Sequence, residues 1–504
     1  MQKNTETRKL TFHPNTHLAE TREDAQWSDD QRHEECGLFG IYGHSDSATH
    51  TALGLHALQH RGQEATGMVV YDGEQFHSHR ALGLVGDNFN SPHVMDRLDG
   101  TMSVGHVRYS TSGETALRNV QPLFADFKFG GLAIAHNGNL TNAYSIRQRL
   151  VKRGCLFQST SDTEVIIHLI AISEYSHVID RITDALSQVE GAYSLVAMTQ
   201  KKLIGVRDPH GVRPLILGRL GDSYILASET CALDIIDAEF VRDVEPGEIV
   251  IIDDKGLRSV KPFSKKTERF CIFEYIYFAR PDSVMESRNV YELRKEIGAE
   301  LARESHVHAD VVVPVPDSGV PAAIGYAETA DIPFELGIIR NHYIGRTFIE
   351  PSDQIRHLGV RLKHNANAAY LKDKRVVLID DSIVRGTTSV KIVEMVRNAG
   401  ASEVHLRVSS PPIGHSCYYG IDTPERDELL AGRMDVEAMA KYIGVDSLAF
   451  ISMDGLYKAV SGGPRNEDNP RFCDACLSGE YPIALVDRDG DTIPGLLSLL
   501  DEQV

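Results

Sequence analysis

The pattern of apolar and polar positions changes twice along the chain. Residues 1–35 carry many charged side chains and few apolar ones, which indicates a weakly ordered leader. From residue 36 to about 260, short apolar runs end at turn-forming Asp-Gly and Asn-Gly pairs, as strands joined by hairpins do. This alternation predicts an α+β domain built on antiparallel sheets, with helices expected over residues 47–60 and 162–174.

Beyond about residue 270, apolar runs alternate with longer helical stretches. The runs at residues 309–315 and 375–380 are almost wholly apolar, and a loop and a helix expected over residues 389–399 follow the second run. Buried strands followed by helices are typical of a parallel α/β sheet. The polar, basic stretch at residues 259–269 separates the two patterns and marks the predicted domain boundary.

Composition and charge limit the classes of protein to which the chain can belong. Hydrophobic residues make up 42% of its 504 residues, which fits globular domains and excludes a disordered or fibrous chain. A net charge of −19 argues against nucleic acid or an anionic membrane as partner, and no apolar stretch approaches the roughly 20 residues of a membrane span. Seven scattered cysteines predict a reduced, cytoplasmic protein rather than a disulfide scaffold.

A candidate phosphate site follows the apolar run at residues 375–380. Asp380 and Asp381 stand at the end of that run, and Gly386 and Thr387 lie just before the expected helix. Ligands of parallel sheets bind at the carboxyl ends of strands, and the free N–H groups of a helix N-terminus attract phosphate. The two carboxylates suit ribose hydroxyls or a hydrated Mg²⁺. The same residues also fit an acidic strand end before an ordinary capped helix.

This segment resembles the phosphoribosyl-pyrophosphate (PRPP) signature of the type I phosphoribosyltransferases. Residues 313–319 resemble the pyrophosphate loop of that family, and residues 346–349 and 361–363 resemble the flap that closes over PRPP. The resemblance implies that residues 382–388 hold the 5′-phosphate. The PRPP-binding residues that it implies are Asp317, Ser318, Gly319, Arg346, Lys363, Asp380, Asp381, Ser382, Arg385, Gly386, Thr387 and Thr388, of which Ser318, Asp380 and Asp381 would also bind Mg²⁺.

Cys36 opens an apolar run in the first half and by itself is typical of an inert buried residue. Its surroundings change that interpretation, because segments of the first half resemble, in order, the N-terminal-nucleophile glutamine amidotransferases. These segments are residues 36–40, 58–62, 105–111, 136–139 and 161–164. The resemblance implies that the leader is removed. Cys36 then becomes the first residue, and its α-amino group, with a pKa of about 8, serves as the local base.

The same resemblance assigns roles to further residues of the first half. Cys36 would attack the carboxamide carbon of glutamine, while the Asn137 side chain and the Gly138 N–H would hold the oxyanion. Arg108 would pair with the α-carboxylate of glutamine, a task suited to a planar guanidinium, and Asp162 would hold the α-ammonium. Without the resemblance, Arg108 and Asp162 read as ordinary surface charges.

A glutaminase half followed by a PRPP-binding half resembles the amidophosphoribosyltransferase family, and residues 274–283 add to this likeness. It implies transfer of ammonia from glutamine to PRPP, giving 5-phosphoribosylamine, pyrophosphate and glutamate at the first step of purine biosynthesis. A homo-oligomer, expected as a tetramer, and feedback inhibition by purine nucleotides are implied as well. The implied organisation is a propeptide at 1–35, an α+β N-terminal-nucleophile hydrolase domain with sandwiched antiparallel sheets at 36–265, an α/β type I phosphoribosyltransferase domain at 266–480 and a tail at 481–504.

The cysteines of the second half have a separate interpretation. Cys473 and Cys476 form a Cys-x-x-Cys pair, which alone fits a redox motif, half a zinc site or no function. One branch of the amidophosphoribosyltransferase family carries a [4Fe–4S] cluster, and the sequences around Cys271 and Cys417 resemble those of its two other ligands. The resemblance implies a structural cluster bound by these four thiolates, with tetrahedral zinc as the alternative.

Other functions stay open at the level of the sequence. A glutamine amidotransferase with another acceptor would carry a different second domain, and the PRPP loop argues against it. A non-catalytic PRPP sensor would have no use for Cys36, its processing site or the Asn137-Gly138 pair. An inactive glutaminase half is a further alternative, although every residue expected in its site is present.

Overall fold

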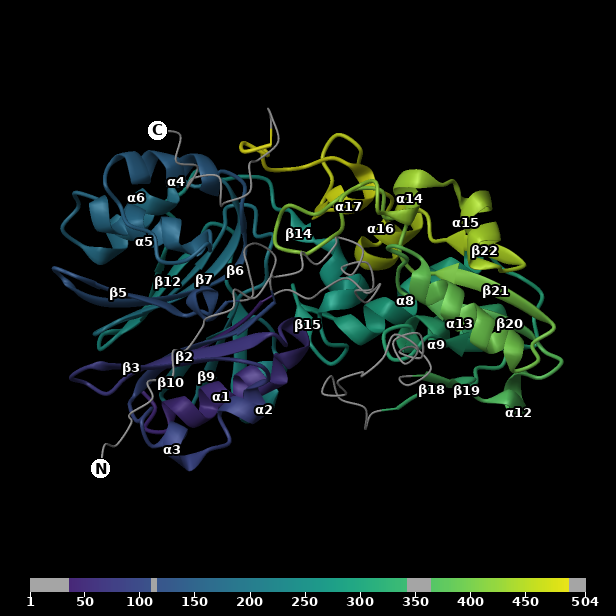
Figure 1. Cartoon of the computed structure of the whole chain (residues 1–504), viewed down its shortest axis with the longest axis horizontal. Helices are drawn as coiled ribbons and strands as arrows, with labels where there is room; N and C mark the ends of the chain where they lie inside the picture. The colour runs from purple at the N-terminus through teal and green to yellow at the C-terminus, as the bar shows by residue number, and fades with distance from the viewer. Residues whose placement is uncertain (1–35, 110–115, 342–363, 489–504) are drawn as a thin grey trace, which may run out of the picture.

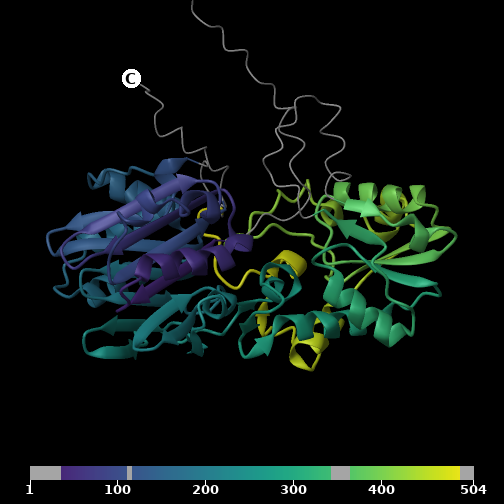
Figure 2. The ribbon, with the colours of Figure 1, turned by 90° about the horizontal axis from the view of Figure 1, so that it is seen from below.

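The chain forms two lobes that lie side by side (Figure 1), and the view from below separates them clearly (Figure 2). The computed structural model describes residues 36–109, 116–341 and 364–488. Strands up to residue 260 build the first lobe, and strands from residue 311 onward build the main sheet of the second.

Stacked antiparallel sheets form the middle of the first lobe. One has seven strands in the order β11-β9-β10-β1-β4-β2-β3, and the other has six in the order β13-β12-β8-β7-β6-β5. Leu38, Val104 and Val196 are among the fully buried side chains that fill the space between them. The strands are β1 (Gly37–Tyr42), β2 (Ala65–Tyr71), β3 (Phe76–Leu82), β4 (Met102–Arg108), β5 (Leu123–Phe127), β6 (Gly130–Leu140), β7 (Gly191–Thr199), β8 (Leu203–Arg207), β9 (Ile216–Leu220), β10 (Ser223–Ala227), β11 (Glu239–Asp243), β12 (Ile249–Asp253) and β13 (Gly256–Val260).

Helices cover the outer faces of both sheets (Figure 1). Apolar residues of α1 (Ser47–Ala57), α2 (Val85–Asn88) and α7 (Cys231–Asp234) pack on the seven-stranded sheet, beside α3 (Pro92–Met95). Those of α4 (Ala143–Lys152), α5 (Thr163–Ile172) and α6 (Val178–Leu186) pack on the six-stranded sheet. The predicted sandwich of antiparallel sheets is therefore confirmed. The expected helix over residues 47–60 ends at Ala57 and is followed by a 3₁₀ turn, Gln59–Arg61.

The second lobe is built on a four-stranded parallel sheet, ordered β17-β20-β21-β22, as the alternating pattern predicted. One face carries α8, α9 and α16, and the other carries α13 and α15. Helix α13 begins two residues before the expected position, because Gly386, with φ of 84°, ends the preceding loop directly before Thr387. The elements are β17 (Val311–Pro314), β20 (Arg375–Asp380), β21 (Glu403–Val408), β22 (Ser447–Phe450), α8 (Val290–Glu304), α9 (Val320–Ala330), α13 (Thr387–Asn398), α15 (Val436–Ile443) and α16 (Met453–Ser461).

Short elements complete the second lobe and connect it with the first. Strand β14 (Phe270–Cys271) follows the linker and pairs in parallel with β23 (Phe472–Cys473), so the two ends of the second half meet. The other short elements are a π-helical turn (Glu274–Phe278), β15 (Val284–Met285), β16 (Arg288–Asn289), β18 (Ile338–Arg340), β19 (His364–Ala366), α12 (Ala368–Leu371), α14 (Leu430–Arg433) and α17 (Ala475–Ser478).

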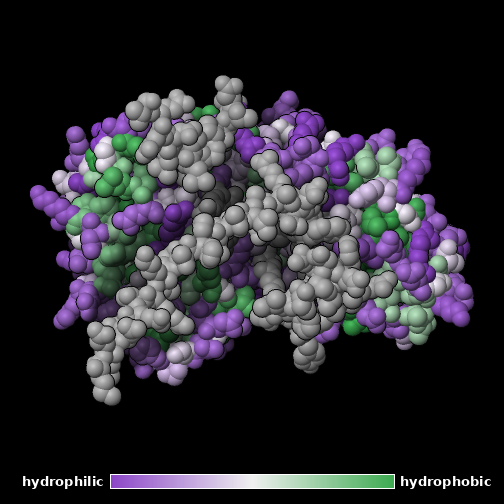
Figure 3. All heavy atoms as spheres, in the orientation of Figure 1, coloured by the Kyte–Doolittle hydropathy of each residue, from purple (hydrophilic) through white to green (hydrophobic). Residues whose placement is uncertain are grey.

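Figure 3 shows hydrophilic side chains around the described outline of both lobes, with hydrophobic side chains visible between the two sheets of the first lobe. Among the described helices, none combines the length and the hydropathy that a membrane crossing requires.

Candidate active sites

Cys36 lies directly before β1, next to the end of β4. The register pairs Gly37 with Val107, so Cys36 and Arg108 become neighbours across the sheet. The Cys36 side chain is buried, and its Sγ donates to the Tyr109 carbonyl oxygen at 3.7 Å. Burial raises the pKa of the Cys36 thiol, while the Arg108 guanidinium opposes that rise. The structure thus places the predicted nucleophile beside the predicted partner of the glutamine α-carboxylate.

Asn137 and Gly138 lie on β6. Asn137 carries a buried amide without a partner among the described residues, and Gly138 lies where the backbone leaves no room for a side chain. The Asn137 side chain is fully buried, yet neither its Oδ1 nor its Nδ2 has a hydrogen-bond partner among the described residues. Leaving such a group unpaired costs about 1–3 kcal/mol, so an unsatisfied amide in a folded protein calls for an explanation. Gly138 has φ of 140°, and a Cβ there would lie 2.0 Å from the Ala192 carbonyl oxygen, so only glycine fits.

Asp162 precedes α5 and faces the end of β6. Its Oδ2 accepts from the Leu140 N–H at 3.0 Å, and its Oδ1 lies 3.7 Å from His136 Nδ1. Burial pushes the pKa of Asp162 upward, but the His136 imidazole and the N–H donors of Leu140 and Thr163 outweigh it, and the pKa lies below its usual value. The carboxylate therefore keeps the negative charge that an α-ammonium group would meet.

Two buried histidines belong to this region although the sequence assigned them no role. His136 Nδ1 lies 3.1 Å from the Thr163 hydroxyl, and its carbonyl oxygen lies 3.2 Å from His106 Nε2. Burial, aided by the Arg108 charge, lowers the pKa of His106 to about 3, so this ring is neutral. In the sequence, His136 stands next to Asn137 and His106 stands two residues before Arg108, and these positions could have pointed to both histidines.

In the second lobe, two predicted loops meet at the carboxyl ends of β17 and β20. Ser318 Oγ donates to Asp381 Oδ2 at 2.5 Å, and Ser382 Oγ donates to Asp381 Oδ1 at 2.6 Å. Burial raises the pKa of Asp381 despite these donors and the nearby Arg294. A cavity of about 30 Å³ lies here and is lined by Tyr277, Val315, Ser318, Asp380, Asp381, Ser382, Ile383, Val384, Thr388 and Ser389.

Other predicted PRPP-binding residues are placed differently. Asp317 pairs with Arg340 at 2.6 Å, and Arg385 pairs with Glu428 at 2.8 Å, and neither residue lines the cavity. Gly319, Gly386 and Thr387 belong to the two loops without lining it. Arg346 and Lys363 lie outside the described residues. Tyr277, which has no role in the sequence-based prediction, reaches the cavity from the π-helical turn.

The cysteines of the second half gather where the chain leaves and re-enters that lobe. Cys271 and Cys473 are register partners on β14 and β23, Cys476 lies on α17, and none is in a disulfide. Burial raises the pKa of Cys271 and of Cys473, and in each case neighbouring thiols including Cys417 add to the rise. Among the residues that the structure describes, no three His, Cys, Asp or Glu side chains are grouped closely enough to hold a single metal ion.

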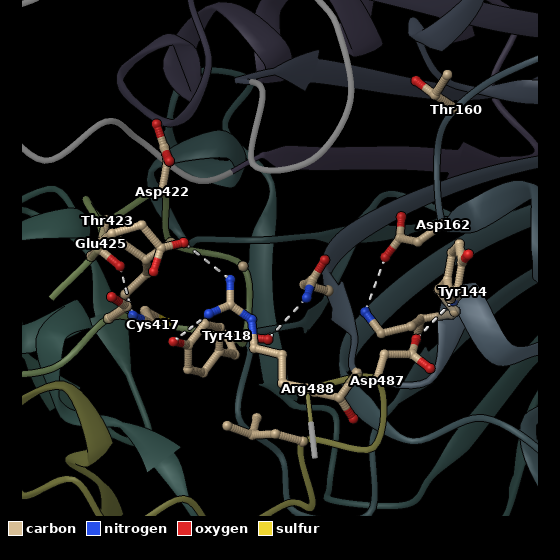
Figure 4. Close-up of a pocket in the computed structure, with 18 of the residues that line it drawn as sticks. Tyr144, Thr160, Asp162, Cys417, Tyr418, Asp422, Thr423, Glu425, Asp487 and Arg488 are labelled. Carbon is tan, nitrogen blue, oxygen red and sulfur yellow. Dashed lines mark hydrogen bonds and ion pairs between the residues drawn. The ribbon is translucent and has the colours of Figure 1, made fainter. Parts of the chain in front are cut away.

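A larger pocket of about 350 Å³ lies between the lobes (Figure 4). Asp162 and Tyr144 line it from the first lobe, and Tyr418 and Glu425 line it from the second. The lobes are also in direct contact beside the predicted oxyanion pair, since Asn139 Nδ2 donates to the Tyr418 carbonyl oxygen at 3.0 Å. The predicted glutamine site therefore borders the segment that carries Cys417.

Both halves match known families of domains. Residues 106–234 match a glutamine amidotransferase domain, and residues 284–414 match a phosphoribosyl transferase domain. Together with the two sites, these matches define the class of protein: a glutamine amidotransferase joined to a phosphoribosyltransferase.

Relatives along the whole chain narrow this class. An amidophosphoribosyltransferase of Rhizobium etli is 59% identical over 477 residues, covering 94% of this chain and 96% of that protein. A chloroplastic amidophosphoribosyltransferase of Glycine max is 52% identical, covering 90% of this chain and 79% of that protein. The structure of glutamine PRPP amidotransferase from B. subtilis, complexed with ADP and GMP, has a TM-score of 0.85 at 47% identity and covers 91% of this chain and 99% of that chain.

The chain belongs to the amidophosphoribosyltransferase family. Members of this family are pentosyltransferases that take nitrogen from glutamine at the first step of purine biosynthesis. The family, the fold of both halves and this activity, all predicted from the sequence, are therefore confirmed.

Proposed function

We propose that the two sites divide the family's reaction into a glutamine step and a PRPP step. In the first, Cys36 Sγ attacks the carboxamide carbon of glutamine, ammonia leaves, and water then releases glutamate from the thioester. In the second, the ammonia attacks C1 of PRPP and displaces pyrophosphate. The observation that carries this proposal is the amide of Asn137, which is buried in the same lobe as Cys36 and has no hydrogen-bond partner among the described residues.

Each residue of the glutaminase site has a task that its surroundings support. Asn137 Nδ2 and the Gly138 N–H hold the oxyanion. The Asn137 side chain is buried, and a donor shielded from water acts more strongly on an oxyanion. Arg108, already tied by Nη1 to the Asn119 carbonyl oxygen at 2.9 Å, presents its charge to the α-carboxylate. Asp162, ionised and anchored by Leu140, binds the α-ammonium.

Cys36 needs a base, and its own α-amino group can serve only when Cys36 is the first residue. We therefore assign residues 1–35 as a propeptide, with the glutaminase domain at 36–265, the phosphoribosyltransferase domain at 266–480 and a tail at 481–504. Trp27 is the only tryptophan of the chain. An active preparation should therefore show an intact mass that starts at Cys36 and no tryptophan fluorescence. Full activity of a chain that keeps Trp27 contradicts this proposal.

In the second step the protein positions PRPP and stabilises charge. Residues 382–388 precede and open α13, where free N–H groups and the helix dipole suit the 5′-phosphate. Asp380 and Asp381 lie at the strand end, where they meet the ribose hydroxyls, and the loop of Asp317, Ser318 and Gly319 meets the pyrophosphate. Arg346 and Lys363 complete this proposed set.

Ser318, Asp380 and Asp381 also supply the oxygen ligands that Mg²⁺ prefers, and the ion neutralises pyrophosphate charge when bound. The phosphoribosyltransferase match supports Mg²⁺ binding by this half of the chain in general.

The remaining cofactor that we assign is a [4Fe–4S] cluster on Cys271, Cys417, Cys473 and Cys476. Tetrahedral zinc on the same four thiols is the alternative, with sulfurs about 2.3 Å from the ion. Cys271, Cys473 and Cys476 lie on β14, β23 and α17, and Cys417 is close enough to raise the pKa of Cys271 and Cys473. Four such thiols suit a multi-iron cluster, in which each thiolate would bind its own iron. The buried Arg213 lies near three of these thiols, where its charge offsets that of thiolates. When bound, the cluster ties the two ends of the second half together.

Assembly, regulation and location complete the proposal. We assign a homo-oligomer, a tetramer by family likeness, that works in the cytoplasm without nucleic-acid or membrane partners. ADP and GMP occupy the related B. subtilis structure, which supports purine nucleotides as feedback inhibitors here.

A further inference from the structure

The geometry points to residues 485–488 as a clamp that positions the glutamine-binding wall of the first lobe. The sequence assigned no function to this last described segment. It crosses from the second lobe to the first beside the pocket between the lobes, where Asp487 and Arg488 lie against residues of both (Figure 4). The clamp is defined as residues 485–488, and its two active parts are the carboxylate of Asp487 and the guanidinium of Arg488.

Asp487 caps the N-terminus of α4, whose own N-cap residue makes no capping hydrogen bond with its side chain. The N-cap residue of α4 is Asn142, but its side chain is engaged elsewhere, with Gln188 and Glu190. Asp487 Oδ2 accepts from the Tyr144 N–H at 2.8 Å and its Oδ1 accepts from the Ser145 N–H at 3.1 Å. These are the second and third N–H groups of the helix, which an N-cap side chain normally satisfies, and a carboxylate there also suits the helix dipole.

The backbone of residues 140–141 connects the capped helix with the proposed glutamine site. The Asp487 N–H donates to the Thr141 carbonyl oxygen at 3.0 Å, so the clamp holds the link between β6 and α4 from two sides. One residue earlier, the Leu140 N–H donates to Asp162 Oδ2 at 3.0 Å. Asn137 and Gly138 lie on the same strand. The clamp therefore fixes the end of the strand that carries the oxyanion pair and orients Asp162.

Arg488 fastens the other end of the clamp to the second lobe. Its Nη1 donates to the Tyr418 hydroxyl at 2.6 Å, and its guanidinium carbon lies 4.0 Å from the centre of that ring. Glu425 pairs with it at 3.3 Å. Because Tyr418 also accepts from Asn139 through its carbonyl oxygen, both lobes and the clamp meet at one residue. Asp487 and Arg488 are thus positioning residues for glutamine binding, not groups that touch the reacting atoms.

The test compares Asp487→Ala with Asp487→Asn, because asparagine caps helices about as well as aspartate. We expect Asp487→Ala to raise KM for glutamine about fivefold or more, the equivalent of one lost cap, with little change in kcat for ammonia-dependent synthesis. Asp487→Asn should restore most of the glutamine KM. Glu437→Ala is the control, since it removes one exposed carboxylate that pairs with Lys441 on α15 of the second lobe.

Labelling of Cys36 supplies a second readout that a general loss of stability would not produce. A diazoketone analogue of glutamine needs the α-group contacts, whereas iodoacetamide does not. Asp487→Ala should slow labelling by the analogue and leave labelling by iodoacetamide unchanged, and Arg488→Ala should act in the same direction. A glutamine KM for Asp487→Ala equal to that of the control overturns the inference, as does equal loss of both activities in the Ala and Asn variants.

This inference rests on the proposed role of Asp162, and Asp162→Asn separates the two. If Asp162→Asn binds glutamine normally, the proposed site is wrong. If it is defective while Asp487→Ala is normal, only the clamp is wrong.

Discussion

Asn137→Ala tests the oxyanion site, because the structure predicts opposite effects on activity and stability. Loss of one oxyanion donor lowers kcat by about 10²–10³, equivalent to about 2.7–4 kcal/mol of transition-state stabilisation. The Asn137 amide is buried without a partner among the described residues, which costs the folded state about 1–3 kcal/mol. Alanine removes that cost and leaves a small space worth about 1 kcal/mol. The variant should therefore be as stable as the parent, or more stable by up to about 2 kcal/mol.

The assay measures glutamine hydrolysis with PRPP present, ammonia-dependent synthesis as an internal reference, and the thermal midpoint. Asn88→Ala is the matched control, elsewhere in the first lobe. It loses bonds to the Leu82 and Leu84 carbonyl oxygens at 2.9 Å, so it should be less stable by about 1 kcal/mol while keeping most glutaminase activity. The oxyanion assignment is refuted if Asn137→Ala hydrolyses glutamine within about tenfold of the parent. It is also refuted if activity falls only together with the thermal midpoint.

Three further predictions concern the second site, the acid limit of stability and the cysteines. Asp381→Asn should lower both glutamine-dependent and ammonia-dependent synthesis by about 100-fold, as measured by PRPP consumption, because both routes share this site. Glu164 accepts from the Gln158 and Ser159 N–H groups at 2.7 Å, and despite burial these donors and His168 lower its pKa from 4.5 to about 2. Its stabilisation is complete above pH 4.5 and is lost as the pH falls toward 2, so acid titration of Glu164→Gln should show a flatter loss of stability in that window. Protein purified without oxygen should contain about four iron atoms per chain, and Cys473→Ser should lose them.

Each of these predictions has an opposing result. Normal PRPP turnover by Asp381→Asn would contradict the proposal that the loop after β20 binds PRPP. If Glu164→Gln loses stability with falling pH as steeply as the parent, the protons that destabilise the fold bind to other groups. One zinc ion per chain and no iron would show that the four cysteines bind zinc rather than a cluster.

The residues predicted from motifs lie on strands, or directly beside them, and the local sequence sets where those strands are. Cys36 precedes a strand and Asn137 lies on one, so the antiparallel sandwich determines where each lies. Asp381 follows a buried parallel strand, and the carboxyl ends of such strands meet at one edge of the sheet. In these cases the hydrophobic pattern and the motif carry the same information.

Residues whose roles depend on distant partners could not be predicted in this way. Asp317 and Arg385 lie in the expected loops, but Asp317 pairs with Arg340 and Arg385 pairs with Glu428. The local sequence around the loops does not predict those partners. Asp487 caps a helix that lies more than 300 residues earlier in the chain. Only the folded chain reveals such contacts, because they depend on how the two lobes meet.

The central claim is that ammonia made at Cys36 feeds a separate PRPP site, and Cys36→Ala tests it most directly. Phosphoribosylamine formation would be followed for the parent and the variant with glutamine and, separately, with a high concentration of ammonia. The account predicts that Cys36→Ala abolishes synthesis from glutamine and keeps most of the synthesis from ammonia. Synthesis from glutamine by the variant, or loss of both reactions in a folded protein, would contradict the division into two sites.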